Sequence, residues 1–146
     1  MQFTIIAAVA GIIGTTGMTL FLYIIDKSGR INANMVKALG SAVTRTVETS
    51  LLPGLLIHYI SGIIFAFLYF NFLQMLQMND VLSLVLAGGI IGFAHGFAFS
   101  FVMVILAEHH PVEQFQNAGF QVAIVHFLAH IFYGLLVGLM FSLYSV

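Results

Sequence analysis

The sequence predicts an all-α membrane protein that forms a single four-helix transmembrane domain over residues 1–146. Two observations support this. Of the 146 residues, 61% are hydrophobic and only 6% are charged, whereas a soluble domain of this size covers its surface with more charged side chains. In addition, four segments reach the roughly 20 apolar residues that a helix needs to cross a bilayer. The expected spans are residues 3–25, 51–77, 82–107 and 119–145.

The first span has no basic stretch before it and is longer than the apolar core of a signal peptide, so we expect a permanent helix. All the basic side chains lie between this span and the second: Lys27, Arg30, Lys37 and Arg45. Positively charged loops remain in the cytoplasm. We therefore expect a multi-pass protein of the cell inner membrane, with residues 26–50 in the cytoplasm and the N- and C-termini outside.

The segment between the first and second spans contains a stretch with helical periodicity. Between Asn32 and Val47 apolar residues recur near helical spacing, whereas Lys37 and Arg45 fall on other faces. This pattern predicts an amphipathic helix that lies in the membrane interface. A structureless loop of this length is the weaker alternative.

The second, third and fourth spans complete what looks like a duplicated hairpin. The Gly-Ile-Ile-Gly sequence of residues 11–14 recurs at residues 89–92, and His58 and His130 are each followed by small residues four and eight positions later. The repeat predicts two hairpins related by a two-fold axis along the membrane normal; coincidence between glycine-rich helices is the alternative. Because small residues at every fourth position let helices approach closely, we expect both histidines on packing faces.

Histidines and carboxylates at membrane depth are the candidate functional residues, because ionisable groups there are costly and mark functional sites by default. His126 and His130 lie one turn apart on one face of the fourth span, which allows both to bind one metal ion. His58 reaches a similar depth from the second span, and more donors follow the third. The predicted metal ligands are His58, Glu108, His109, His110, Glu113, His126 and His130. All seven meet only if the loop after the third span folds down toward the histidines or that span ends early; otherwise we expect a site of His58, His126 and His130.

Imidazole and carboxylate donors together favour an iron, manganese or zinc ion over copper(I), with haem as the alternative cofactor. The seven methionines include no Met-x-Met cluster and do not indicate a copper route, and the chain has no cysteine to supply thiolates. Hydrogen bonds between helices, or a polar interfacial loop, are the alternative roles for these histidines and carboxylates. For His95, near the middle of the third span, we expect a helix-packing hydrogen bond, with a role as a deep metal ligand as the alternative.

Three functions fit these residues. The first is an integral membrane protein with a His/Glu metal site on the cytoplasmic half of the bundle, redox-active if the metal is. The second is an accessory or structural subunit of a larger membrane complex. The third is a proton-coupled small transporter that acts as a homodimer, with His58 and His130 as proton sites. The lipid bilayer is the expected partner, and the net charge of −1 argues against nucleic acid. The sequence specifies no reaction.

Several short motifs recur together along most of the chain: Gly14-Thr15-x-x-Met18-Thr19, Asn34-Met35, Ile57-His58-x3-Gly62, His95-Gly96 and His130-x2-Tyr133-Gly134. In this arrangement the chain resembles a group of small uncharacterised bacterial four-helix inner-membrane proteins. The resemblance implies the four-span fold and carries over no activity.

Overall fold

The computed structural model describes residues 2–29 and 31–145, and within these ranges it contains helices and no strand. The helices are α1 (Gln2–Lys27), α2 (Met35–Thr44), α3 (Leu51–Met75), α4 (Val81–Ala107), the one-turn 3-10 helix η1 (Glu113–Phe115) and α5 (Phe120–Ser145). Four of them, α1, α3, α4 and α5, are long and apolar enough to cross a membrane. The four predicted apolar segments therefore form the four long helices, with ends close to the predicted ones.

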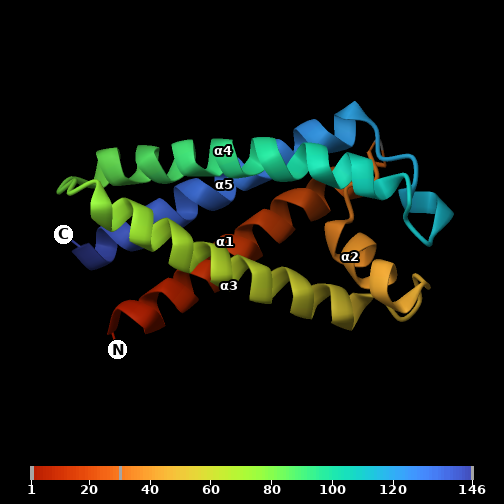
Figure 1. Ribbon diagram of the computed structural model, residues 1–146, viewed down its shortest axis with the longest axis horizontal. Coiled ribbons are helices and arrows are strands. Elements are labelled where there is room, and N and C mark those ends of the chain that lie inside the picture. Colours follow the sequence, from red (N-terminus) through yellow and green to blue (C-terminus); the bar gives the residue numbers. More distant parts are fainter. Residues whose placement is uncertain (1, 30, 146) are drawn as a thin grey trace.

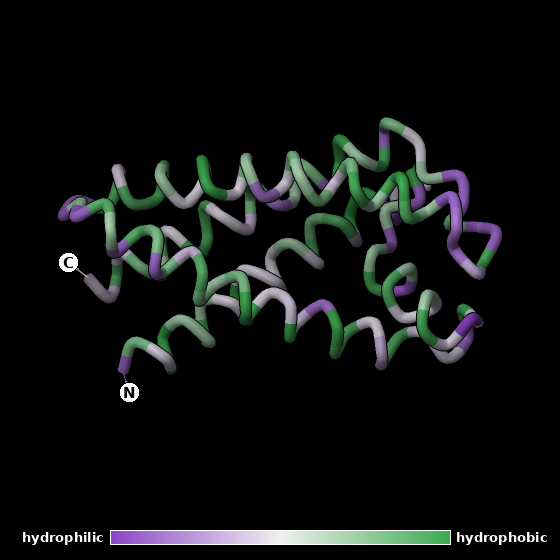
Figure 2. Tube along the Cα trace, viewed as in Figure 1, coloured by the Kyte–Doolittle hydropathy of each residue, from purple (hydrophilic) through white to green (hydrophobic). Residues whose placement is uncertain are grey.

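The chain termini and the connecting loops are divided between the two ends of the bundle. Figure 1 shows both termini at one end, together with the turn between α3 and α4. At the other end, here called the α2 end, lie α2 and the loop between α4 and α5. Hydrophobic residues cover the long helices, and hydrophilic ones gather mainly at the two ends (Figure 2). This distribution is compatible with a multi-pass membrane protein.

Helices α4 and α5 pair along most of their length through small residues. A methyl group added at Gly92 of α4 would lie 2.6 Å from the carbonyl oxygen of His130, and one at Gly138 of α5 would lie 2.6 Å from the carbonyl oxygen of Leu84. Only glycine permits such an approach of two backbones. His130 is therefore buried against α4, which confirms the prediction that its face of the span is a packing face.

Helices α1 and α3 also pack closely through small residues. A methyl group at Gly11 of α1 would lie 2.6 Å from the Cα atom of Ile63, and one at Gly62 of α3 would overlap the hydroxyl of Thr15. Ala66, one turn further along α3, is fully buried. The face that His58 shares with these small residues is thus also a packing face, as predicted.

Helix α2 confirms that the segment between the first two spans contains a helix. Asn34 caps its N-terminus, because the Asn34 side chain accepts a hydrogen bond of 3.1 Å from the backbone N–H of Lys37. The helix ends at Thr44, because Arg45 adopts the left-handed conformation with a φ of 62°. Gly40 lets α2 pack closely against the start of α3 at Ser50, so α2 closes one end of the bundle.

Candidate functional site

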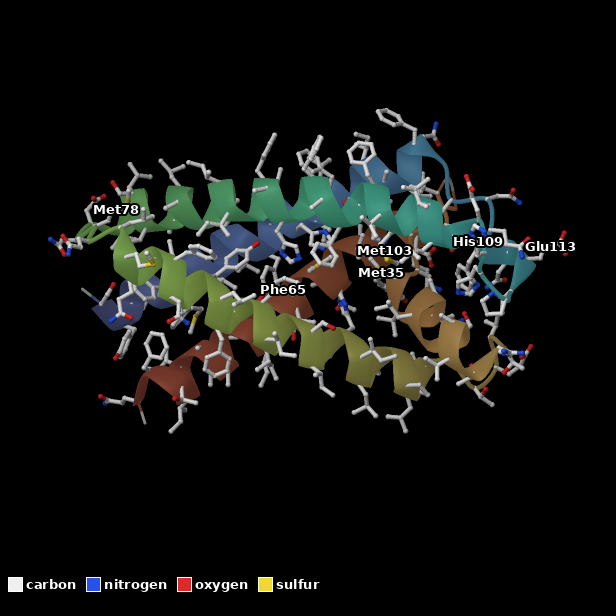
Figure 3. The ribbon with its side chains drawn as sticks, in the orientation of Figure 1. Met35, Phe65, Met78, Met103, His109 and Glu113 are labelled. Atoms are coloured by element: carbon white, nitrogen blue, oxygen red, sulfur yellow. The ribbon has the colours of Figure 1, made fainter. Side chains whose placement is uncertain are left out.

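Three of the six histidines meet at a cavity inside the bundle. His58 of α3, His95 of α4 and His130 of α5 line this space of about 190 Å³, here called the inner cavity. Figure 3 labels Phe65 on its wall and, nearer the α2 end, Met35 and Met103. The described residues that line it are Thr15, Met18, Met35, Leu39, His58, Ser61, Gly62, Phe65, His95, Phe99, Met103, His130 and Tyr133.

His130 is held by its own helix in one orientation. Its Nδ1 atom donates a hydrogen bond of 2.7 Å to the carbonyl oxygen of His126, and Nδ1 of His126 donates in the same way to Val122. A carbonyl oxygen only accepts, so each neutral ring carries its hydrogen on Nδ1 and its lone pair on Nε2. Histidines that bind metals are oriented by such a bond from the other ring nitrogen.

His58, which lines the inner cavity, has a buried ring nitrogen without a hydrogen-bond partner among the described residues. Among residues 2–29 and 31–145, its buried Nε2 atom finds no hydrogen-bond partner, and neither does the hydroxyl of Thr15. Both side chains line the inner cavity. Such buried polar atoms are rare in native proteins and cost about 1–3 kcal/mol each. A ligand bound in the inner cavity would therefore be close to two polar groups, the Nε2 atom of His58 and the hydroxyl of Thr15, that have no hydrogen-bond partner among the described residues.

His95 makes the helix-packing hydrogen bond that its sequence position predicts. Its Nδ1 atom and the hydroxyl of Tyr69 in α3 share a hydrogen bond of 3.0 Å. Its ring stacks on Phe65 with the centroids 4.0 Å apart, and the ring of His130 lies edge-on with a centroid separation of 4.6 Å. This contact with His130 was missed from the sequence, because residue spacing does not show which faces of α4 and α5 meet.

A second, larger cavity of about 400 Å³ lies at the α2 end, here called the outer cavity. Its walls come from α2, the last turns of α4, the following loop and the start of α5, and they include His109, His110 and His126. His126 and His130 therefore line different cavities, although they lie one turn apart on the same helix. Three side chains line both cavities, namely Met35, Leu39 and Met103.

The loop after α4 keeps its polar residues away from the inner cavity. Glu108 and Glu113 are exposed, and neither is among the described residues that line the two cavities. His110 uses both ring nitrogens: Nε2 donates to the carbonyl oxygen of Ala38 in α2 over 2.9 Å, and Nδ1 accepts from the N–H of Val112 over 3.1 Å. His110 therefore attaches the loop to α2.

The seven predicted ligands thus do not come together. Because α4 stays helical to Ala107, the loop begins beyond the end of the bundle instead of folding down to the histidines. Within the described ranges, no group of three or more His, Cys, Asp or Glu side chains is arranged to hold a metal ion. Of the predicted set, His58 and His130 line the inner cavity, whereas His109, His110 and His126 line the outer cavity.

Three residues of the inner cavity carry no functional signal in the sequence. Thr15 and Met18 come from α1, and Tyr133 of α5 donates a hydrogen bond of 2.5 Å to the carbonyl oxygen of Gly62 in α3. Thr15 and Met18 stand together in the short motif of residues 14–19. That motif shows local similarity but has no spacing typical of a metal or catalytic site.

The comparisons with known proteins identify a family without a described activity. The model of a family of unknown function, DUF6789, matches residues 1–146. No curated protein and no solved structure matches the chain. The chain therefore belongs to the family of unknown function DUF6789, whose model covers it from end to end.

Proposed function

We propose that this chain is an integral membrane protein that binds a transition-metal ion in the inner cavity, with Nε2 of His58 and Nε2 of His130 as ligands. The main observation behind the proposal is the buried, unpartnered Nε2 atom of His58. The His58 side chain lines the same cavity as His130, whose ring is oriented through its Nδ1 atom. Uncharged imidazoles with a free Nε2 lone pair are common metal ligands in proteins.

The donors and the size of the cavity narrow the choice of ligand. Imidazole suits zinc, copper, iron and nickel, whereas manganese favours carboxylates, and the predicted carboxylates Glu108 and Glu113 lie outside the cavity. At about 190 Å³ the inner cavity is smaller than the roughly 300 Å³ at which small-molecule pockets begin. A single ion therefore fits the site better than haem.

Metal analysis of the purified protein tests this proposal. The protein is incubated in lipid nanodiscs with zinc or copper and desalted, and bound metal is measured by mass spectrometry. We expect one ion per chain in the wild type and loss of that ion in His58→Ala and in His130→Ala. His109→Ala is the matched control, because this histidine is exposed. Circular dichroism and size-exclusion chromatography show whether each variant keeps its fold.

An absence of bound metal in the folded wild-type protein after reconstitution would refute the proposal. Retention of a full equivalent in both folded inner-cavity variants would refute the assignment of His58 and His130. If either variant fails to fold, the conservative change His58→Gln or His130→Gln replaces it, because glutamine keeps a polar side chain of similar length.

We further propose that the α2 end faces the cytoplasm. Lys27 lies in the last turn of α1, Lys37 in α2 and Arg45 at the C-cap of α2, all at this end. Arg30, the fourth basic residue, lies outside the described residues. The confinement of these cations to one end supports a cytoplasmic location.

We also propose that the two helix pairs are a duplicated hairpin. In the first pair, Gly11 of α1 approaches Gly62 of α3; in the second, Gly88 of α4 approaches Gly134 of α5. The sequence repeat aligns Gly62 with Gly134 and Gly11 with Gly89. The glycine that contacts Gly134 is Gly88, the neighbour of Gly89, so the two contacts differ from exact equivalence by one residue. Superposition of the two pairs in an experimental structure tests the proposal, which fails if His58 and His130 do not coincide.

A further inference from the structure

Three methionines line the inner cavity together with the histidines. Met18 comes from α1, Met35 from α2 and Met103 from α4. Met18 and Met35 are buried, with 4% and 7% of their surface exposed. The three are far apart in the sequence and form no Met-x-Met cluster, so their convergence is a result of the tertiary structure alone.

Met18 lies in the same layer of the bundle as the two proposed histidine ligands. Gly62 provides the reference level, because it contacts Thr15 of α1 and accepts the hydrogen bond from Tyr133 of α5. Met18 lies three residues from Thr15, and His130 lies three residues from Tyr133. His58 lies four residues from Gly62. Each of these steps is about one helical turn toward the α2 end, so Met18, His58 and His130 reach the same depth.

The donors at this depth are soft. Thioethers select copper(I) among the biological transition metals, and imidazole also binds copper. None of the described residues that line the inner cavity is a carboxylate, so the hard ligands that favour manganese or magnesium do not contribute. Copper(I) accepts low coordination numbers, so two imidazoles and one thioether suffice, and the site needs no third histidine or carboxylate.

We propose that the ion bound in the inner cavity is copper(I), held by His58, His130 and the thioether of Met18. This inference rests on the proposed function and names its ion. Met35 and Met103 line the inner and the outer cavity alike. Figure 3 shows both methionines between Phe65 and the α2 end, so an ion that moves from the outer to the inner cavity would meet their thioethers first. These two methionines are positioned to transfer the ion and Met18 to bind it.

The test compares copper(I) with zinc on the same nanodisc preparation. Copper(I) is titrated without oxygen against a chromophoric copper(I) chelator, and zinc against a zinc chelator. We expect one copper(I) per chain. In Met18→Leu the copper(I) affinity should fall about tenfold or more, since even the loss of supporting groups around a metal site costs about 10–100-fold, while the zinc affinity stays unchanged. Met75→Leu is the matched control, because Met75 of α3 is 77% exposed.

X-ray absorption at the copper edge provides a second measurement. We expect a sulfur neighbour of copper in the wild type and in Met75→Leu, and its loss in Met18→Leu. In the double variant Met35→Leu, Met103→Leu we expect slower copper uptake with an unchanged equilibrium affinity.

Two outcomes separate the inference from the proposed function. Zinc binding through His58 and His130 without copper(I) affinity would contradict the copper inference but support the proposed metal site. Bound copper without a sulfur neighbour would have the same meaning. A protein that binds neither ion contradicts both.

Discussion

The hydroxyl of Tyr133 in α5 donates a hydrogen bond of 2.5 Å to the carbonyl oxygen of Gly62 in α3. This bond joins the two helix pairs one turn from the layer of His58 and His130. It therefore fixes the relative depth of the two helices that carry the proposed ligands.

Removal of this hydroxyl is expected to loosen the contact between the two helix pairs. Tyr133→Phe keeps the ring in place and should lower the free energy of unfolding by about 0.6 kcal/mol, a typical value for a hydrogen bond between membrane helices. Reversible unfolding in lipid bicelles measures the change. Tyr144→Phe, on the exposed end of the same helix, is the control and should have no effect. Equal stability of Tyr133→Phe and the wild type would contradict a structural role for the bond.

A methyl group at Gly92 should separate α4 from α5. In Gly92→Ala the new atom would lie 2.6 Å from the carbonyl oxygen of His130, and backbone atoms cannot move aside locally. We expect a loss of about 1–3 kcal/mol, the usual cost of overpacking, as a lower unfolding temperature. Gly119→Ala is the control, because no described atom lies within 4 Å of the added methyl group. If the two variants melt alike, the close contact is not important for stability.

Loss of the His110 side chain should free the loop after α4 without affecting the inner cavity. His110→Ala removes the hydrogen bonds to Ala38 and Val112. Hydrogen exchange should become faster in residues 108–118, and the metal content should stay the same. In His109→Ala, which alters the exposed neighbour, exchange should match the wild type. A lower metal content in His110→Ala would show that the loop contributes to the site after all.

The N-terminus of α4 should weaken in acid. The side chain of Asp80 accepts a hydrogen bond from the N–H of Ser83 over 2.8 Å, which lowers the pKa of this carboxyl below its ordinary value of 3.8. Because the pKa is lower in the folded state, the carboxylate stabilises the helix above pH 3.8, and this contribution is lost as the pH falls through the folded pKa.

Asp80→Ala should therefore lower the unfolding temperature at neutral pH, and its difference from the wild type should shrink below pH 3.8. Thermal melts across the pH range check this, with Asn79→Ala as the control. A difference that is the same at all pH values would show that the Asp80 charge is not involved.

Single-cysteine variants test the orientation, because the chain has no cysteine of its own. Ser28→Cys introduces a thiol at the α2 end, and Asn79→Cys introduces one in the turn at the opposite end. In intact cells, a maleimide that cannot cross membranes should label the Asn79→Cys variant at once. It should label the Ser28→Cys variant only after the membrane is opened. The reverse pattern would place the α2 end outside.

The sequence by itself determined the four long helices and the packing faces of His58 and His130. Both follow from local properties, because apolar length defines a membrane-spanning helix and small residues at every fourth position mark a close helix contact. It also indicated the helix between the first two spans. These features depend on residues that are near one another in the chain.

Only the tertiary structure decided which of the polar and sulfur-containing residues share a cavity. The sequence predicted that His126, Glu108 and Glu113 share a metal site with His130. In the structure His126 lines the outer cavity, and the two carboxylates are exposed. Met18 lines the inner cavity with His58 instead. The physical reason is that the rotation and depth of each helix are set by contacts between distant segments, such as Gly92 with His130 and Tyr133 with Gly62.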